Sequence, residues 1–387
     1  MKKKKVFYIL SQLYAYGEIA SQVWRLRNLY YDQDNYDITI ITYPLQKLRV
    51  NKSLYNIAMR GLNVVHSTDD KMIWFPQDYP SNKIFEDDDS IFVNLESGEL
   101  RNLFLQKYQN KTPNFFFKLS KNELKMGNQL MDHYKIPSGS PIITLHVRET
   151  GYKNSHGRPE GSDGTLRNAK IETFFPTIKY LLDEGYYIVR LGDNTMTQIP
   201  FNHKRLIDVP FCSFYNDLVD LFFISKSFFF ICSPSGPLTI ADAFATPRLI
   251  TNFPIWEHVW AWKNDLYLFK KYYSYQKNKL LSYEDILCSE VLNIPNINKA
   301  KELKIEVIDN TSEEIFSAVK EMIARLKGNY FSSQEMKSIN KYFRCIQFKA
   351  SKLHSEYTTP ILNLFDNKNV PISLEYIRLN RHFIDLK

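Results

Sequence analysis

Cysteine is scarce in this sequence, and its few cysteines lie far apart. Cys212, Cys232, Cys288 and Cys345 include no Cys-x-x-Cys pair, and none has a histidine at metal-ligand spacing. A zinc ribbon and the disulfide framework of a small secreted domain are therefore excluded. We expect four reduced and buried thiols, as in a cytoplasmic protein.

Long hydrophobic runs are also lacking. The apolar stretch after the N-terminal lysines ends at Leu10, too short for the hydrophobic region of a signal peptide, and no cleavage site follows it. No other stretch approaches the length of about 20 apolar residues that a membrane-spanning helix requires. We expect a soluble protein that stays in the cytoplasm.

No recognised nucleic-acid-binding motif accompanies the positive charge of the chain. The 387 residues include 50 Lys and Arg against 42 Asp and Glu, a formal net charge of +8, and the basic residues are scattered. We therefore expect no nucleic-acid partner. The charge suits attraction to an anionic membrane surface or to a phosphate-bearing substrate, although a solvated basic surface is the simpler explanation.

What the sequence does contain is an alternation of short apolar runs with amphipathic stretches. This pattern is typical of βαβ units and of a mostly parallel sheet, so the expected fold class is α/β. Apolar residues at helical spacing predict helices, such as one from Gly17 to Tyr30. The predicted strands are 6–10, 37–42, 63–66, 90–95, 141–148, 186–193, 205–209, 228–232 and 248–251, and the other predicted helices are 121–134, 171–183, 216–225, 237–245 and 311–327.

A cluster of Pro, Gly and Ser at 136–141 is the best candidate for a domain boundary. A new series of strands and helices begins after it. We predict one Rossmann-like domain at 1–136, a second at 137–328 and a more polar helical extension at 329–387. Two such domains would face one another, and a ligand should bind in the cleft between them.

The predicted strand at 141–148 ends in two side chains that can carry positive charge, His146 and Arg148. In an open α/β sheet, ligands bind beyond the carboxyl ends of the strands. An arginine there presents a rigid fork of donors that suits phosphate or carboxylate oxygens. The pattern indicates an anion site, and the alternative is a structural ion pair of Arg148.

A second signal of this kind follows the predicted strand at 228–232. There the chain continues as Ser233-Pro-Ser-Gly-Pro237 and enters a predicted helix, whose N-terminal N–H groups and dipole favour an anion. The glycine allows a ligand to approach the backbone closely. Two anion sites at strand ends of one sheet suggest a diphosphate, and hence a nucleotide-linked substrate.

In chain order these motifs resemble those of a family of bacterial glycosyltransferases with the two-domain GT-B fold. They are His146-Val-Arg148, Gly151-Tyr152, Arg167-Asn168-Ala169, the stretch 186–193, Ser233–Pro237, Thr246-Pro247, Asn252-Phe-Pro254 and Asn310–Ile315. The His-x-Arg segment is similar to the donor-binding motif of fucosyltransferases, and the Ser-x-Ser-Gly-Pro turn to the diphosphate turn of heptosyltransferases and sugar 2-epimerases. Residues 141–327 carry the resemblance, which implies that this half binds the donor and the N-terminal half the acceptor.

The resemblance implies that Arg148 binds the donor diphosphate and stabilises the charge on the departing nucleotide. Such stabilisation is what a transferase without a metal needs most, so Arg148 is a predicted catalytic residue. Simpler structural roles remain open, such as a helix N-cap at Asn168 or at the serines and a turn carboxylate at Asp193. The predicted donor-binding residues are His146, Arg148, Arg167, Asn168, Gly192, Asp193, Ser233, Ser235 and Gly236.

In GT-B enzymes the loop after the first strand faces the cleft, which implies acceptor-binding roles for Tyr16 and Gly17. Glu18 is a predicted catalytic base that removes the proton of the acceptor hydroxyl, unless it only complements the dipole of its helix. The alternative bases are Glu149, Glu160 and Asp163.

Two clusters have simpler explanations. Asp87-Asp88-Asp89 is similar to the DxD motif of metal-dependent transferases, but it precedes a predicted strand, so a solvated acidic loop is the expected role. We expect no bound metal and no cofactor beyond the nucleotide-sugar substrate. Aromatic residues that could stack on a sugar, or simply pack together, are Trp256, His258, Trp260 and Trp262.

The sequence thus predicts a cytoplasmic, metal-independent, inverting glycosyltransferase, with peripheral contact to the inner membrane at most. It would move a hexosyl or deoxyhexosyl group from a nucleotide-diphosphate donor to a glycan or lipid-linked acceptor in O-antigen, capsule or lipooligosaccharide synthesis. The alternatives are a nucleotide-sugar 2-epimerase or hydrolase of the same fold, and a non-catalytic protein that binds nucleotide sugars or glycans.

Overall fold

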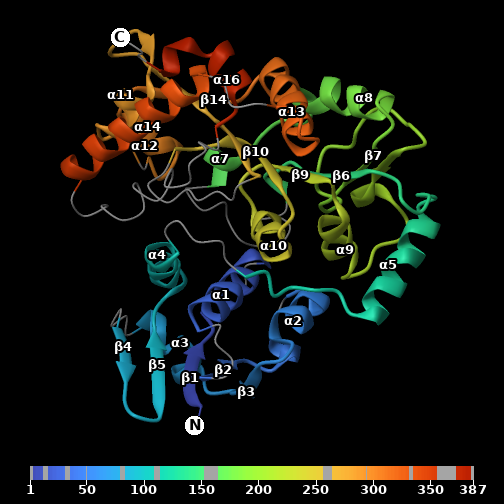
Figure 1. Cartoon of the computed structure of the whole chain (residues 1–387), viewed down its shortest axis with the longest axis vertical. Coiled ribbons are helices and arrows are strands. Elements are labelled where there is room, and N and C mark those ends of the chain that lie inside the picture. The colour runs from blue at the N-terminus through green and yellow to red at the C-terminus, as the bar shows by residue number, and fades with distance from the viewer. Residues whose placement is uncertain are drawn as a thin grey trace. The chain divides into compact units, whose positions relative to one another are not determined.

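The computed structural model describes residues 3–11, 16–30, 35–48, 50–78, 83–108, 114–151, 164–255, 264–292, 294–330, 334–354 and 372–384. The chain divides into two compact units, each with its own largely parallel sheet (Figure 1). The first unit consists of Met1–Leu130, Asn216–Ser225 and Gly236–Thr246, and the second of Met131–Tyr215, Lys226–Ser235 and Pro247–Lys387.

The sheet of the first unit has five strands in the order β3-β2-β1-β5-β4. Strands β1 (Lys4–Ile9), β2 (Tyr36–Thr42), β3 (Asn63–His66) and β5 (Ser90–Asn94) run parallel, and β4 (Lys83–Glu86) pairs antiparallel with β5. The sequence predicted all of these strands except β4. Every residue of β4 is exposed, so its sequence carries no buried apolar face to reveal it.

Helices cover this sheet because their apolar residues recur on one face. Helix α1 (Tyr16–Leu29) buries Ile19, Val23 and Leu26 at spacings of four and three residues. It packs against α10 (Gly236–Phe244), which also belongs to the first unit. The other helices are α2 (Lys52–Met59), α3 (Asp70–Asp78), α4 (Ser97–Lys107), α5 (Lys121–His133), in which the first unit ends, and α9 (Val219–Lys226).

The sheet of the second unit has six strands in the order β11-β10-β9-β6-β7-β8, all parallel. Read from β8, the order of appearance along the chain is 3-2-1-4-5-6, which is the order of doubly wound nucleotide-binding sheets. The strand order reverses between β6 and β9. The bounds are β6 (Ile142–His146), β7 (Tyr187–Arg190), β8 (Leu206–Asp208), β9 (Phe229–Cys232), β10 (Arg248–Phe253) and β11 (Leu266–Phe269).

The strands next to this reversal are buried on both faces. Every residue of β6, β9 and β10 is buried, as expected for a parallel sheet that is covered on both sides. This is why their sequences are nearly continuous apolar runs. The predicted α/β fold with two Rossmann-like parallel sheets is therefore confirmed.

The second unit also contains a small antiparallel sheet in the order β13-β12-β14 and a C-terminal group of helices. Helix α13 (Ser312–Leu326) begins with a capping box of Thr311 and Glu314. Glu314 also accepts hydrogen bonds from Lys271 at 2.5 Å and from Asn380 at 2.8 Å, so it holds the C-terminal segment against this unit. The remaining elements are β12 (Lys271–Ser274), β13 (Lys279–Leu280), β14 (Ile305–Ile308), α11 (Tyr283–Leu287), α12 (Ile297–Glu302), α14 (Gln334–Leu353) and α16 (Leu374–Leu379).

Helix α7 (Gly164–Arg167) precedes the predicted helix 171–183, which has two parts. It begins as the 3₁₀ helix η2 (Ile171–Phe174) and continues as α8 (Phe175–Asp183), with a proline in the first turn of α8. Gly185 follows with a φ of 92°, a left-handed conformation that glycine adopts freely at the end of a helix.

The expectation that all four cysteines are buried is wrong. All four are free thiols, but only Cys232 is buried. Cys212 and Cys288 are half-buried, and Cys345 is exposed because it lies on the outer face of α14. Among the helices in the described ranges, none is both long enough and apolar enough to cross a membrane.

Candidate functional site

The backbone at Arg148 lies beside the carboxyl ends of β6 and β9, where the strand order of the second sheet reverses. Its amide donates to the hydroxyl of Ser233 at 2.6 Å, and the amide of Ser233 donates to the carbonyl of His146 at 3.1 Å. Its own carbonyl accepts from Ala169 at 3.1 Å. Ligands of doubly wound sheets bind at such a reversal. The structure therefore brings together the two anion signals of the sequence.

Asn168 connects Arg148 to a second buried cation. The guanidinium of Arg148 donates to the side-chain oxygen of Asn168, and the ammonium of Lys270 donates to the backbone oxygen of Asn168 at 2.8 Å. Lys270 also forms an ion pair with Asp309. Burial lowers the pKa of Lys270, and the carboxylate of Asp309 opposes that shift. We call Arg148, Asn168, Ser233 and Lys270 the switch-point site.

The N-cap interpretation of Asn168 is wrong. Asn168 follows α7, and the next helix, η2, has Lys170 as its N-cap residue. The side chain of Asn168 binds Arg148 instead, which the local sequence could not reveal because the two residues lie on different segments.

Lys270 is a site residue that the sequence analysis missed. It directly follows the fully buried strand β11. This is the same pattern, an apolar strand that ends in a cation, that singled out Arg148. The signal was present in the sequence, but no strand was predicted there.

A cavity of about 200 Å³ adjoins the switch-point site. Asn168, Lys270 and Asp309 line it together with apolar side chains from α12 and β14, so one wall is charged and another is apolar. The full lining is Leu166, Asn168, Ala169, Lys170, Lys270, Ile297, Val307 and Asp309. A partly polar group such as a nucleobase or a ribose suits such a lining.

His146 is buried and neutral at pH 7. Burial lowers its pKa to about 4; Arg190 and Arg148 act in the same direction, and the contact with Leu191 and the charge of Asp193 oppose them. One ring nitrogen, Nδ1, lies 3.1 Å from the carbonyl oxygen of Leu191, and a carbonyl can only accept. Nδ1 therefore carries the proton and Nε2 is an acceptor. In this state His146 cannot donate to a phosphate through Nε2, contrary to one of its predicted roles.

Glu149 is engaged by protein groups on both oxygens. Oε1 lies 3.0 Å from the guanidinium of Arg190, and Oε2 accepts from both the amide and the hydroxyl of Thr197 at 2.8 Å. Arg190 is fully buried and also pairs with Asp208 at 3.2 Å. Glu149 thus fixes the chain next to Arg148, and this geometry disfavours it as a base.

Gly192 and Asp193 shape the turn after β7. Asp193 accepts a hydrogen bond from the amide of Thr195 at 2.9 Å, which is the turn-carboxylate role considered from the sequence. Gly192 has a φ of 148°, and a Cβ there would lie 2.2 Å from the sulfur of Met196. Only glycine fits this position.

The serines lie at the end of β9. Ser233 is fully buried, and the hydroxyl of Ser235 donates to the carbonyl of Ser233 at 3.1 Å. Neither forms the predicted N-cap contact. Arg167 ends α7 and is half-buried.

In the first unit, Gly17 and Gly236 mark a close approach of α1 and α10. A Cβ on Gly17 would lie 2.6 Å from the carbonyl oxygen of Gly236, and the carbonyl of Gly17 accepts from Thr239 at 2.9 Å. This geometry favours helix packing over ligand binding for both glycines. Tyr16 is the first residue of α1.

Glu18 lies in the first turn of α1, at the reversal of strand order between β1 and β5 of the first sheet. Its carboxylate accepts a hydrogen bond from the hydroxyl of Ser97 at the start of α4, the helix after β5. Glu18 is thus the predicted base at the strand-order reversal of the first sheet, and Glu149 the one at the reversal of the second sheet. Other predicted groups lie outside the described residues: Glu160, Asp163, Trp256, His258, Trp260 and Trp262.

The acidic triplet 87–89 is an exposed turn, as expected. Asp87 accepts from the amides of Asp89 at 2.9 Å and Ser90 at 2.6 Å. Within the described ranges, no three His, Cys, Asp or Glu side chains are grouped so that they could hold a metal ion.

No protein-family profile matches this sequence, and no curated protein matches it. Among solved structures, it is similar to a glycosyl transferase family 9 protein from Veillonella parvula, with a TM-score of 0.48 and 10% identity over 84% of this chain and 97% of that chain. It is also similar to ADP-heptose LPS heptosyltransferase II from E. coli, with a TM-score of 0.34 and 10% identity over 64% and 84% of the two chains. Likenesses this distant leave the reaction and the substrate to be argued from the residues of this chain.

Proposed function

We propose that this protein is a glycosyltransferase that moves a sugar from a nucleotide-diphosphate donor to a glycan acceptor. The observation that carries the proposal is the switch-point site, where Arg148 and Lys270 meet at Asn168 beside a cavity of about 200 Å³. Two cations suit a diphosphate, and the adjoining cavity suits the nucleoside attached to it.

In the proposed reaction, an acceptor hydroxyl attacks the anomeric carbon of the donor sugar. A C–O bond forms, the bond between that carbon and the β-phosphate oxygen breaks, and its electron pair leaves on the nucleotide diphosphate. Attack opposite to the leaving group inverts the configuration. A guanidinium has five donors in a rigid fork, so Arg148 can bind Asn168 and a phosphate oxygen together.

The charge that develops on the leaving diphosphate is the main barrier that protein groups can lower here. Arg148 and Lys270 would carry the stabilisation that a divalent cation supplies in metal-dependent transferases. We propose Glu18 as the base that takes the hydroxyl proton, because its carboxylate lies at the strand-order reversal of the first sheet. The acceptor would be part of a cell-surface glycan such as O-antigen, capsule or lipooligosaccharide.

The outer face of α14 supports a lipid-linked acceptor. Its exposed residues include the cations Lys337, Lys341, Arg344 and Lys352, and Phe348 is 56% exposed among them. Each cation near an anionic membrane surface contributes about 1 kcal/mol of attraction, and an exposed ring can enter the headgroup region. We propose that this face contacts the inner membrane peripherally.

The first test is the thermal stability of the protein with GDP, UDP, ADP, CMP and CDP, with and without magnesium. A nucleotide at about 100 times its dissociation constant should stabilise the fold by about 2.7 kcal/mol. Magnesium should not be needed. If no nucleotide raises the melting temperature, the proposal fails.

The second test is Arg148→Ala, with the exposed Lys277→Ala of the same unit as a control for loss of one positive charge. We expect Arg148→Ala to abolish both donor turnover and the nucleotide-induced shift while it retains the fold, and Lys277→Ala to behave as wild type. Donor turnover of Arg148→Ala at the wild-type rate would refute the assignment. Conversion of the donor by wild-type protein without any acceptor, seen by NMR, would indicate an epimerase or hydrolase instead.

A further inference from the structure

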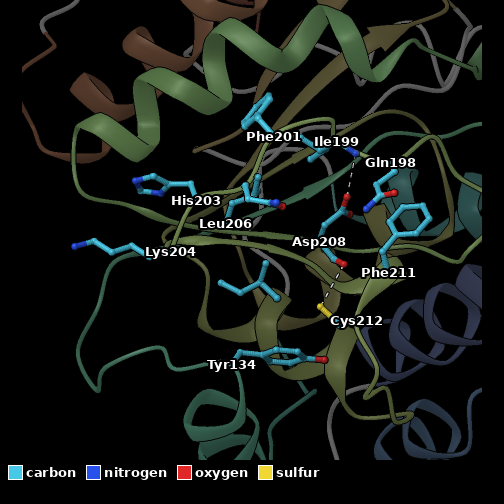
Figure 2. A pocket seen from close by; sticks show the side chains of 12 residues that line it. Tyr134, Gln198, Ile199, Phe201, His203, Lys204, Leu206, Asp208, Phe211 and Cys212 are labelled. Carbon is cyan, nitrogen blue, oxygen red and sulfur yellow. Dashed lines mark hydrogen bonds between the residues drawn. The ribbon is translucent and has the colours of Figure 1, made fainter.

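A second cavity, of about 460 Å³, lies along β8, the strand at one edge of the six-stranded sheet (Figure 2). Its lining comes from three segments: the chain after α5, the loop before β8, and β8 with the residues that follow it. Its volume is within the range of small-molecule sites, about 300–1,000 Å³. We call it the edge cavity. No residue of the switch-point site lines it.

Aromatic rings surround the edge cavity. Figure 2 shows Tyr134, Phe201 and Phe211 on different sides of it. Phe211 is 37% exposed, and the same segment continues with Phe214 at 40% and Tyr215 at 49%. Three exposed rings therefore lie within five residues, and Phe211 among them lines the cavity.

Most polar groups of the cavity can exchange hydrogen bonds without imposing a charge. The exposed Lys204 also lines it, and Figure 2 shows its side chain extending away from Asp208 and Gln198. The amide side chains of Gln198 and Asn202 are exposed in its lining. The carboxylate of Asp208, which Figure 2 shows among them, pairs with the buried Arg190 and accepts from the amide of Ile199, each at 3.2 Å. Its negative charge is thus directed at Arg190, which it shares with Glu149, rather than at a ligand.

This combination favours one chemical class of ligand. A sugar ring has an apolar C–H face that stacks on aromatic side chains and hydroxyls that both donate and accept hydrogen bonds. Amide groups match those hydroxyls, because an amide also donates and accepts. An organic cation would need an uncompensated carboxylate, and an aliphatic ligand would leave the amides without partners. We propose that the edge cavity binds a saccharide unit.

The saccharide would belong to the acceptor or product glycan, and this identity alone rests on the proposed transferase function. A second contact would keep a glycan chain attached to the enzyme between transfers, because it raises the effective concentration of the chain end. The cavity itself is defined by its own residues, so glycan binding can be measured without any transfer reaction.

The experiment is saturation-transfer-difference NMR with maltotriose, cellotriose and chitotriose, together with a glycan array, on the full chain. We expect at least one glycan to bind with millimolar or better affinity. Phe211→Ala and Gln198→Ala should each weaken that binding about three- to tenfold, because the first removes a stacking surface and the second a hydrogen-bonding amide. Tyr275→Ala, which removes a 61% exposed ring elsewhere in the same unit, should not weaken it.

The outcomes separate this proposal from the proposed function. Glycan binding that Phe211→Ala weakens but Arg148→Ala does not supports the edge cavity, whether or not nucleotides bind. Nucleotide binding without any glycan binding would overturn the edge cavity as a saccharide site and leave the transferase proposal standing. Displacement of the glycan by GDP, UDP or ADP in Arg148→Ala protein would also overturn it, because the cavity would then be a nucleotide site. If Tyr275→Ala weakened glycan binding as much as Phe211→Ala does, the glycan would bind to another surface.

Discussion

Replacement of Arg190 by methionine should destabilise the second unit strongly. Arg190 is fully buried and pairs with two carboxylates, Glu149 at 3.0 Å and Asp208 at 3.2 Å. Methionine fills most of the same volume but carries no charge, so both carboxylates lose their cation. Because Glu149 follows Arg148 directly in the chain, the substitution should also disturb the switch-point site.

The expected loss follows from the burial of the three groups. Removal of one partner from a buried ion pair costs about 3–5 kcal/mol. The carboxylates of Glu149 and Asp208 retain 16% and 15% exposure, and Glu149 keeps its two bonds from Thr197, so the lower end applies. We expect a loss of about 3 kcal/mol at pH 8. With a denaturant slope of about 2 kcal/mol per molar urea, the unfolding midpoint should fall by about 1.5 M.

The loss of unfolding free energy that Arg190→Met causes should become smaller as the pH falls. Burial raises the pKa of Asp208, and Arg190 opposes that shift, so loss of Arg190 raises the pKa of Asp208 further in the folded protein. A folded-state pKa above the unfolded value makes stability rise toward lower pH, because the folded variant binds the extra proton. Adding Glu149→Gln and Asp208→Asn to Arg190→Met should recover much of the loss at pH 8.

The assay is urea unfolding followed by circular dichroism at pH 5 and pH 8. A loss below about 1 kcal/mol for Arg190→Met at pH 8, or no recovery in the triple variant, would refute the view that Arg190 compensates two buried charges.

Further predictions address the histidine, the helix contact and the membrane. Because burial lowers the pKa of folded His146 to about 4, its contribution to stability is complete above about pH 6.5. The unfolding free energy of the wild type should fall by up to about 3 kcal/mol between about pH 6.5 and pH 4. That of His146→Asn should fall by less over the same range. Gly17→Ala should lower the unfolding free energy by about 1–3 kcal/mol, because its Cβ would lie 2.6 Å from a backbone oxygen. Gly98→Ala, whose Cβ would have its nearest neighbour at 4.0 Å, should not lower it. Equal effects of the two substitutions would contradict the close approach of α1 and α10. Charge reversal of Lys341 and Arg344 to Glu should reduce co-sedimentation with phosphatidylglycerol vesicles more than tenfold, with phosphatidylcholine vesicles as the control; undiminished binding would exclude this face of α14.

The residues of the switch-point site were only partly predictable. Arg148 and Ser233 were found because each follows an apolar strand, which is a local pattern. Lys270 follows the same pattern but was missed because no strand was predicted at 266–269. The edge cavity gave no sequence signal, since its rings come from segments that are separate in the chain.

The partners of charged side chains were not predictable. Glu149 stands next to Arg148, yet the ion pair it forms is with Arg190, 41 residues away. Asn168 and Arg148 are 20 residues apart, and their hydrogen bond depends on where α7 places Asn168. Local patterns say which groups are polar, but not which group each will meet.

The sequence by itself determined most strands of the two larger sheets and the α/β class, because the period of apolar residues specifies helix or strand without reference to the rest of the chain. Only the tertiary structure decided that β6 and β9 are neighbours, which joins Arg148 to Ser233 across 85 residues. Strand order depends on which apolar faces the helices cover and on the handedness of the connections between strands, and both are properties of the folded chain as a whole. For the same reason, the sequence could propose an anion site and list Asn168 in it, but could not show that Arg148 and Lys270 both bind Asn168 beside a cavity.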